Sequence, residues 1–147
     1  MSDSIILRGL GSYAPAKRLS NDDLTHLVDT SDEWIRSRTG IRERRIAAHE
    51  ENASDMGVEA ARRALADAQL KPEDVDLLIV GTMTPDLPFP ATACIIQHKL
   101  GLKTVPAFDV GAACSGFLYI VEVGTAMLRA GPYRTALLVG TEKMSAV

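Results

Sequence analysis

Apolar residues along this chain fall into short continuous runs and into longer stretches with helical spacing. The short runs, rich in Val, Ile and Leu, predict strands that are buried on both faces. The stretches in which apolar residues recur every three or four positions predict helices. The predicted strands cover residues 4–10, 75–81, 105–110 and 135–140, and the predicted helices cover 20–29, a short segment from 31, 52–70, 91–100 and 117–130.

Helix-starting and helix-ending residues mark the boundaries of these elements. Ser20 precedes Asp22 and Asp23, which is typical of an N-cap with carboxylates in the first turn. Pro72 and Gly101 follow two of the long helices. Strands and helices alternate with short connections, which predicts a mostly parallel, right-handed α/β architecture. Because no linker interrupts the pattern, we expect one domain over residues 1–147.

Composition narrows the class of protein. The chain has 147 residues, of which 46% are hydrophobic and 24% charged, which excludes a disordered or low-complexity protein. No apolar run approaches the ~20 residues of a membrane helix, and Met1–Ile5 does not resemble a secretory signal. A net charge of −3 argues against a general nucleic-acid binder. Two cysteines without metal-ligand spacing indicate neither a metal site nor a disulfide framework, and we expect a cytoplasmic protein.

Cys114 is the sharpest candidate for chemistry. It follows a predicted buried strand and Gly111, and it precedes the predicted helix 117–130. This order predicts a nucleophile elbow at the carboxyl edge of a parallel sheet, where reactive groups gather in α/β proteins. A helix N-terminus there favours the thiolate form. The alternative, a buried structural cysteine, is left open by the spacing.

The remaining thiol and the imidazoles carry weaker signals. Cys94 lies between apolar residues of the predicted helix 91–100, which indicates a core position. A thiol nucleophile usually has a base or a charge stabiliser beside it. His26, His49 and His98 show no spacing to Cys114 that identifies one of them as a catalytic base.

Five arginines between residues 36 and 45, opposed only by Glu43, give that window a charge of +4 in an acidic protein. Guanidinium groups bind phosphate in a bidentate manner, and the only tryptophan, Trp34, lies just upstream. An aromatic ring beside arginines can stack on a nucleobase. The pattern indicates a nucleotide-bearing ligand or an acidic partner. The alternative is a solvated basic loop.

A proline-rich loop follows the strand 75–81. Pro85, Pro88 and Pro90 surround Phe89 and predict a rigid segment that presents an apolar ring. Such a loop can line a pocket or meet a second subunit, and ordinary loop packing is the simpler interpretation.

Four segments together closely resemble the β-ketoacyl-acyl-carrier-protein synthase III family of the thiolase superfamily. They are the Gly11-Ser12-Tyr13-Ala14-Pro15 opening, Asp29–Ile35 with its tryptophan, the Arg38-Thr39-Gly40-Ile41-Arg42-Glu43-Arg44 block, and Phe108–Phe117 with the cysteine elbow. The resemblance runs along essentially the whole chain. It implies a thiolase-like fold, of which this chain is the N-terminal αβαβα half, with a mostly parallel sheet and a buried helix after the elbow.

The resemblance also implies roles for individual residues. Cys114 would take an acyl group from acyl-coenzyme A as a thioester. No metal and no permanently bound cofactor are implied, because acyl-coenzyme A is a substrate. The other matched positions are Trp34 and Arg38 at the adenine of coenzyme A with Thr30 and Thr39 nearby, Phe89 at a dimer interface, and Met83 and Met144 near sites that shape acyl-chain choice.

The implied reaction is the initiating condensation of type II fatty acid synthesis. The acyl group on Cys114 would condense with malonyl-acyl carrier protein with loss of carbon dioxide, in a homodimeric acyltransferase. Family members are about twice as long as this chain, and their catalytic His and Asn lie in the second half. We therefore expect an N-terminal half with an exposed sheet edge and incomplete condensation machinery. The alternatives are a non-catalytic carrier-protein, coenzyme A or dimerisation fragment, and a related synthase of secondary metabolism.

Overall fold

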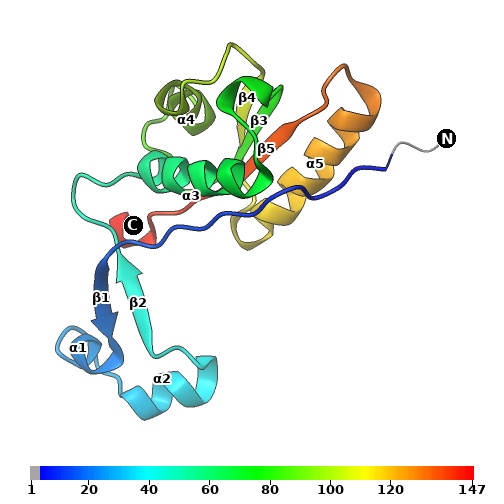
Figure 1. Ribbon diagram of the computed structural model, residues 1–147. Coiled ribbons are helices and arrows are strands. Elements are labelled where there is room, and N and C mark those ends of the chain that lie inside the picture. Colours follow the sequence, from blue (N-terminus) through cyan, green and yellow to red (C-terminus); the bar gives the residue numbers. More distant parts are fainter. Residues whose placement is uncertain (1–3) are drawn as a thin grey trace. The chain divides into compact units, whose positions relative to one another are not determined.

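A parallel three-stranded sheet forms the centre of the larger part of the chain (Figure 1). Its strands are β3 (Leu77–Gly81), β4 (Ala107–Val110) and β5 (Ala136–Gly140), in the order β4-β3-β5. Ile79 of the central strand pairs with Phe108 on one side and with Leu138 on the other. The predicted strands 75–81, 105–110 and 135–140 are therefore confirmed, each one or two residues shorter than expected.

Alternate residues of these strands pack on opposite faces of the sheet. Leu78 and Val80 belong to one core cluster, with Leu137 and Val139 of β5 beside them. Leu77 and Ile79 belong to a second cluster on the other face. Because both faces of β3 are covered, all five of its residues are buried, as a continuous apolar run predicts.

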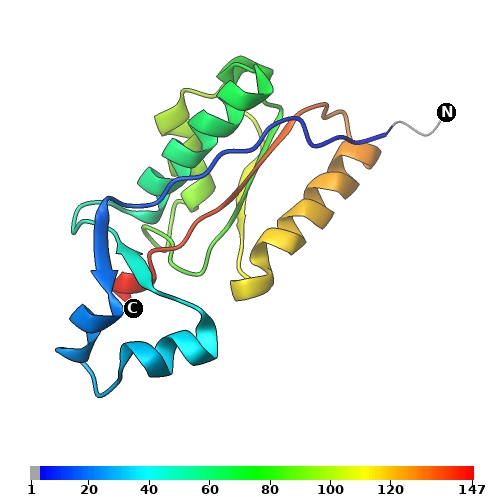
Figure 2. The ribbon, with the colours of Figure 1, turned by 60° about the horizontal axis from the view of Figure 1, so that its bottom comes forward.

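Helices cover both faces of the sheet (Figure 2). α3 (Ala53–Ala68) and α4 (Thr92–Leu100) pack on the face of Leu78 and Val80, and α5 (Gly116–Ala130) packs on the face of Leu77 and Ile79. These helices confirm the three long predicted helices. Short 3₁₀ turns at Pro72–Asp74, Ala113–Ser115 and Met144–Ala146 complete this part of the chain.

The computed structural model describes residues 4–147; residues 1–3, part of the argument against a secretory signal, lie outside the described range. Contacts within the chain form two compact units. Residues 4–13 and 52–147 form the sheet unit, and residues 14–51 form the arm unit. A single domain over 1–147 stays a prediction.

The arm unit consists of two short strands and two short helices. β1 (Lys17–Ser20) pairs antiparallel with β2 (Glu43–Ile46), and α1 (Asn21–Thr25) and α2 (Asp32–Thr39) lie between them in sequence. Ser20 caps α1 with a capping box, and Ser31 caps α2, as their sequences predict. α1 ends four residues earlier than expected, because the following Leu27 and Val28 have no core to pack against and remain exposed.

The predicted strand 4–10 is wrong. This segment pairs with no described strand and runs along α3 in the sheet unit. The Leu10 N–H donates to Asp67 Oδ2 at 2.9 Å, and a Cβ added to Gly11 would lie 2.3 Å from the Ala60 carbonyl oxygen. The glycines let the backbone lie directly on the helix, and the helix offers no ladder of hydrogen bonds for a strand.

The prediction of a buried helix after the elbow holds for only one face of α5. Ile120 is fully buried against the sheet, but the side chains of Phe117, Leu118 and Tyr119 are exposed. α3 and α4 both pack on the far side of the sheet from α5, so neither of them covers these side chains. An apolar face is thus left uncovered in the described part of the chain.

Candidate functional site at the carboxyl edge of the sheet

Cys114 lies on a sharp turn between β4 and α5. The chain leaves β4 at Val110, and the Ser115 N–H donates to the Ala112 carbonyl at 3.0 Å to close the turn. Ala113 has a φ of 44°, in the left-handed region that non-glycine residues seldom adopt. Cys114 is a free, exposed thiol. The strand–turn–helix arrangement predicted for Cys114 is confirmed, and the alternative of a buried structural cysteine is wrong for the described chain.

The elbow sits directly on the end of the central strand. A Cβ added to Gly81 would lie 3.3 Å from the carbonyl carbon of Gly116, the first residue of α5. Only residues as small as glycine permit the first residue of α5 to approach the last residue of β3 this closely. The N-terminus of α5 has no side-chain cap hydrogen bond. Its dipole and N–H groups therefore face the region where Cys114 lies, which favours negative charge there.

A carboxylate joins the loops that follow β3 and β5 at this same edge. Glu142 Oε1 accepts from the Met83 N–H at 2.8 Å, and Glu142 Oε2 accepts from the Thr84 hydroxyl at 2.5 Å. A Cβ added to Gly111 of the elbow would lie 3.3 Å from Met83 Sδ. The structure thus brings Met83 beside the elbow of Cys114, and its role in an acyl pocket stays a prediction.

The other two predicted pocket residues lie on neighbouring loops of the sheet unit. Met144 begins the 3₁₀ turn after β5 and is exposed. Phe89 is 82% exposed on the loop between β3 and α4, so the interpretation of ordinary loop packing is wrong for its ring. The loop itself is held near its start by Asp86, which accepts from the Ser54 N–H at 2.8 Å. The acyl-pocket role of Met144 and the dimer role of Phe89 stay predictions.

Trp34 and Arg38 form an exposed pair on α2. They lie one helical turn apart, and the Arg38 guanidinium carbon is 5.0 Å from the centre of the Trp34 ring. Trp34 is 54% exposed, so one more flat ring could stack on this surface. Thr30 is half-buried in the turn before α2. The Thr39 hydroxyl is engaged at the end of α2, donating to the Ile35 carbonyl and accepting from the Ile41 N–H.

A buried amide organises the arm unit. Asn21 is 1% exposed, and its Nδ2 donates to Asp32 Oδ1 and to the Ile41 carbonyl, both at 2.8 Å. Its Oδ1 accepts from Arg44 Nη2 at 3.0 Å. The hydrogen bond from Asn21, followed by the one from Arg36, holds the pKa of Asp32 below its usual value. This network fixes the start of α2, and with it the helix that carries Trp34.

The five arginines of the basic window do not act alike. Arg36 pairs with Asp32 at 3.2 Å, Arg44 binds Asn21, and Arg45 donates to the Pro15 carbonyl at 2.6 Å. Within residues 4–147, Arg38 and Arg42 have no ion pair or hydrogen bond of their side chains. Three of the five arginines therefore build the unit, and for Arg38 and Arg42 both the ligand surface and the solvated basic loop stay predictions.

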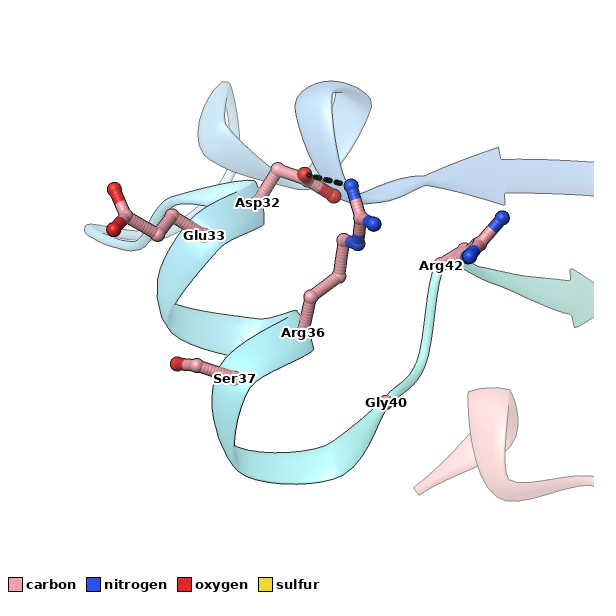
Figure 3. Close-up of a pocket in the computed structure, with 6 residues that line it drawn as sticks. All are labelled: Asp32, Glu33, Arg36, Ser37, Gly40 and Arg42. Atoms are coloured by element: carbon pink, nitrogen blue, oxygen red, sulfur yellow. Dashed lines mark hydrogen bonds and ion pairs between the residues drawn. The ribbon is translucent and has the colours of Figure 1, made fainter.

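A shallow hollow opens beside α2 (Figure 3). The figure shows Arg36 turned towards Asp32, with Glu33 and Ser37 on the other side of the helix and Arg42 beyond Gly40. Trp34, Arg38, Thr30 and Thr39 do not line it. The hollow and the Trp34–Arg38 surface are thus separate features of the arm unit, while Cys114 belongs to the sheet unit.

The remaining candidates lie as follows. Cys94 is half-buried on α4, its Sγ 3.8 Å from the Ala107 carbonyl, and His98 lies in the last turn of that helix. Over residues 4–147, no three His, Cys, Asp or Glu side chains are grouped closely enough to hold a metal ion. The same residues include no helix with the length and apolar character to cross a membrane.

Three polar residues that hold elements together were not predicted from the sequence: Asn21, Glu142 and Asp109. Asp109 lies on β4 and accepts from the Thr92 and Ala93 N–H groups at 2.7 and 2.8 Å, which caps α4. The available signal was a charged residue inside or directly after an apolar strand, which is the case for Asp109 and Glu142. Asn21 carries no comparable signal.

Comparison with known proteins agrees with this architecture. The family profile described as "Thiolase, N-terminal domain" matches residues 35–147. A β-ketoacyl-[acyl-carrier-protein] synthase III of Neisseria gonorrhoeae is 54% identical over 142 residues, covering 96% of this chain and 44% of the relative. The chain therefore spans less than half the length of this relative.

Solved structures share the fold at high similarity. The 3-oxoacyl-[acyl-carrier-protein] synthase III of Aquifex aeolicus matches with a TM-score of 0.91 and 48% identity, over 95% of this chain and 45% of its own. The priming β-ketosynthase of the R1128 polyketide pathway matches with a TM-score of 0.92 and 40% identity, over 96% and 42%. The chain thus belongs to the thiolase N-terminal domain family, in the form found in β-ketoacyl-[acyl-carrier-protein] synthase III.

Proposed function

We propose that this chain carries the acyl-accepting half of a β-ketoacyl-[acyl-carrier-protein] synthase III, with Cys114 as the nucleophile. The observation that carries the proposal is the exposed thiol of Cys114 on a strained turn, at the N-terminus of α5 and on the carboxyl edge of the sheet. This is the place where a parallel α/β sheet presents reactive groups. The similarity to synthases over nearly the whole chain supports the same role.

In the proposed acylation, the Cys114 sulfur attacks the thioester carbonyl carbon of acyl-coenzyme A. The new carbon–sulfur bond forms as the bond to the coenzyme A sulfur breaks, and coenzyme A leaves as a thiol with the proton of Cys114. The negative carbonyl oxygen of the intermediate needs N–H donors, and the backbone N–H of Cys114 is the proposed donor from this chain.

The arm unit supplies the proposed coenzyme A surface. The adenine ring would stack on the exposed face of Trp34, and Arg38 would hold a phosphate or stack beside it. Thr30 is proposed to lie near the same ligand. Thr39 is a weaker member of the set, since its hydroxyl already serves the end of α2.

The later steps are proposed for the longer protein to which the relatives correspond. The acyl group on Cys114 would be attacked by the carbanion that malonyl-acyl carrier protein forms on losing carbon dioxide, which releases the thiolate and a 3-oxoacyl product. Acyl carrier protein and a second copy of the chain, contacted through Phe89, are the proposed partners. The likeness to a priming ketosynthase of a polyketide pathway favours a synthase of secondary metabolism as the second candidate.

Intact-mass spectrometry after incubation with acetyl-coenzyme A tests acylation. We expect one acetyl group per chain, removable by hydroxylamine and mapped to Cys114, and no adduct on a Cys114→Ser variant. The half-buried Cys94 serves as the internal control thiol. Arg38→Ala should retain acylation but need a higher acetyl-coenzyme A concentration. Labelling that persists in Cys114→Ser would refute the assignment of the nucleophile, and a wild-type chain that takes no acetyl group would refute acylation by this chain.

A further inference from the structure

We propose that Glu142 is a positioning residue: it holds Met83 against the elbow and thereby limits the size of the group that can reach Cys114. The inference deepens the proposed function and rests on it for its biological meaning. It concerns the loops after β3 and β5, which meet beside the elbow within the sheet unit.

Glu142 contacts the turn formed by residues 82–84, and its hydrogen bonds to that turn are called the clamp below. Both carboxylate oxygens are used, Oε1 by the Met83 N–H at 2.8 Å and Oε2 by the Thr84 hydroxyl at 2.5 Å. The Thr82 hydroxyl approaches Oε2 at 3.4 Å and accepts from the Thr84 N–H at 3.1 Å. One side chain from the loop after β5 thus contacts three successive residues, Thr82, Met83 and Thr84.

The next residue of the loop after β5 also binds the turn at 82–84. The Lys143 N–H donates to Thr84 Oγ1 at 2.8 Å. The strand ends beneath are fixed by backbone bonds, from the Thr82 N–H to the Val110 carbonyl and from the Thr141 N–H to the Gly81 carbonyl. The turn and the elbow therefore start from the same hydrogen-bonded strand ends, and the clamp adds the side-chain contacts that hold Met83 above them.

Met83 is the side chain that the clamp places. Its backbone N–H is bound by Glu142, and its sulfur lies close enough to Gly111 that a Cβ there would be 3.3 Å away. Met83 is 54% exposed; the hollow that it lines with Thr84, Lys143 and Ala146 does not include Cys114, so the link to the elbow is the approach of its sulfur to Gly111. A flexible thioether beside the elbow shapes access to Cys114 only if its backbone is held. Glu142 provides that restraint.

The clamp needs an acceptor on each oxygen of residue 142. In Glu142→Gln the one remaining oxygen can accept from the Met83 N–H, but the NH₂ group cannot accept the Thr84 hydroxyl proton, so that hydrogen bond of the clamp is lost. The turn should loosen and Met83 should move away from the elbow. Large groups should then gain access to Cys114 relative to small ones.

Two thiol reagents of different size test this without acyl-coenzyme A. Methyl and benzyl methanethiosulfonate react with Cys114 by forming a disulfide while methanesulfinate leaves and the thiol proton goes to solvent. The rate ratio, methyl over benzyl, is measured by mass spectrometry with mapping to Cys114. We expect Glu142→Gln to lower this ratio roughly fivefold. Thr84→Val, which removes one bond of the clamp, should shift the ratio in the same direction.

Two further variants separate positioning from a general effect. Glu73→Gln makes the same charge change at an exposed residue before β3, at the opposite edge of the sheet, and should leave the ratio unchanged. In a Met83→Ala background, Glu142→Gln should have no further effect on the ratio, because the residue through which it acts is absent. Far-ultraviolet circular dichroism checks that each variant is folded.

The outcomes divide cleanly. An unchanged ratio in folded Glu142→Gln and Thr84→Val overturns the inference, and so does an equal shift in Glu73→Gln or a shift that persists without Met83. Disulfide labelling does not involve acyl transfer. A chain that shows the predicted ratios but takes no acetyl group would refute the proposed function and leave the role of Glu142 in place.

Discussion

The N-termini of α3 and α4 are each bound by one carboxylate from another part of the sheet unit. α4 begins at Thr92 after Ala91, a residue that cannot cap a helix, and its N–H groups are bound by Asp109 of β4. α3 begins beside Asp86, which binds Ser54 from the loop after β3. α5, which follows Cys114, has no such carboxylate cap. The difference leaves the helix N-terminus beside the Cys114 thiol without a carboxylate, so the helix dipole there is available to another negative charge.

Asp109→Ala should destabilise the sheet unit by about 2 kcal/mol, because two charge-assisted hydrogen bonds and the favourable helix-dipole interaction are lost together. Urea unfolding followed by circular dichroism measures the change. Asp109→Asn keeps one acceptor oxygen and should lie between Ala and wild type. Equal stability of Asp109→Ala and wild type would show that the cap contributes nothing.

At the level of elements, the arm unit is held by polar contacts where the sheet unit is held by apolar ones. Among residues 14–51 only Pro15, Asn21 and Ile35 are buried, and Asn21 makes three side-chain hydrogen bonds. A small unit with little apolar burial depends strongly on such a network. The placement of α2, and hence of Trp34 and Arg38, follows from one amide.

Asn21→Leu should therefore loosen α2 selectively. Leucine has a similar volume but leaves Asp32, Arg44 and the Ile41 carbonyl without their partner, at a cost of at least about 2 kcal/mol. Amide hydrogen exchange should show faster exchange in α2, with β3 unchanged. Asp22→Ala, at an exposed neighbouring position, is the matched control and should exchange like wild type. Uniform protection in Asn21→Leu would contradict the role of the network.

The sequence predicted most of the sheet unit, but in the arm unit only the two helices and not the two strands, for a physical reason. Apolar runs such as Leu77–Gly81 and helical spacing as in α3 report burial directly, and both were located to within two residues. β1 and β2 consist largely of charged residues, Lys17, Arg18, Arg44 and Arg45 among them, so no apolar alternation marks them. Residues 4–10 are apolar but lie on a helix, and no local pattern distinguishes that from pairing in a sheet.

The sequence predicted Cys114 of the candidate site, but not the residues that hold the surrounding loops in place. Cys114 is marked by glycine, small residues and the start of a helix, all of which are local in sequence. Glu142 and Met83 meet across 59 positions of sequence, and Asp109 and Thr92 across 17. Contacts of this kind depend on strand order, which the alternation of elements leaves open.

For the molecule as a whole, four aspartates make stability dependent on acid. The pKa of Asp76 is lowered by the Arg134 N–H and further by Lys103, and that of Asp23 by the Ser20 hydroxyl and N–H. The pKa of Asp32 is lowered by the hydrogen bonds from Asn21 and Arg36. Burial raises the pKa of Asp55, but the hydrogen bonds from Lys99 and the Asn52 N–H outweigh burial, so its pKa is lowered as well. Folded carboxylates with lowered pKa values bind protons less readily than unfolded ones, so each stabilises the fold when ionised.

The free energy of unfolding should thus be constant above about pH 5 and fall as the pH drops below the ordinary aspartate pKa of 3.8 towards the lower folded values. Urea unfolding at a series of pH values measures how steeply the free energy of unfolding falls with pH. Asp76→Asn should make this fall less steep. Asp22→Asn should leave it unchanged, because the Asp22 side chain is exposed and has no partner within residues 4–147. A slope that Asp76→Asn leaves unaltered would show that this carboxylate is not a source of the acid sensitivity.

The division into two units also separates the chromophores of the protein. The only tryptophan, Trp34, belongs to residues 14–51, and all three tyrosines, Tyr13, Tyr119 and Tyr133, belong to the sheet unit. Emission excited at the red edge of the tryptophan band therefore reports on one unit, and near-ultraviolet tyrosine signals report on the other. Coincident melting curves would mean that both units unfold as one cooperative system, and an earlier tryptophan transition would make the arm a separate thermodynamic unit.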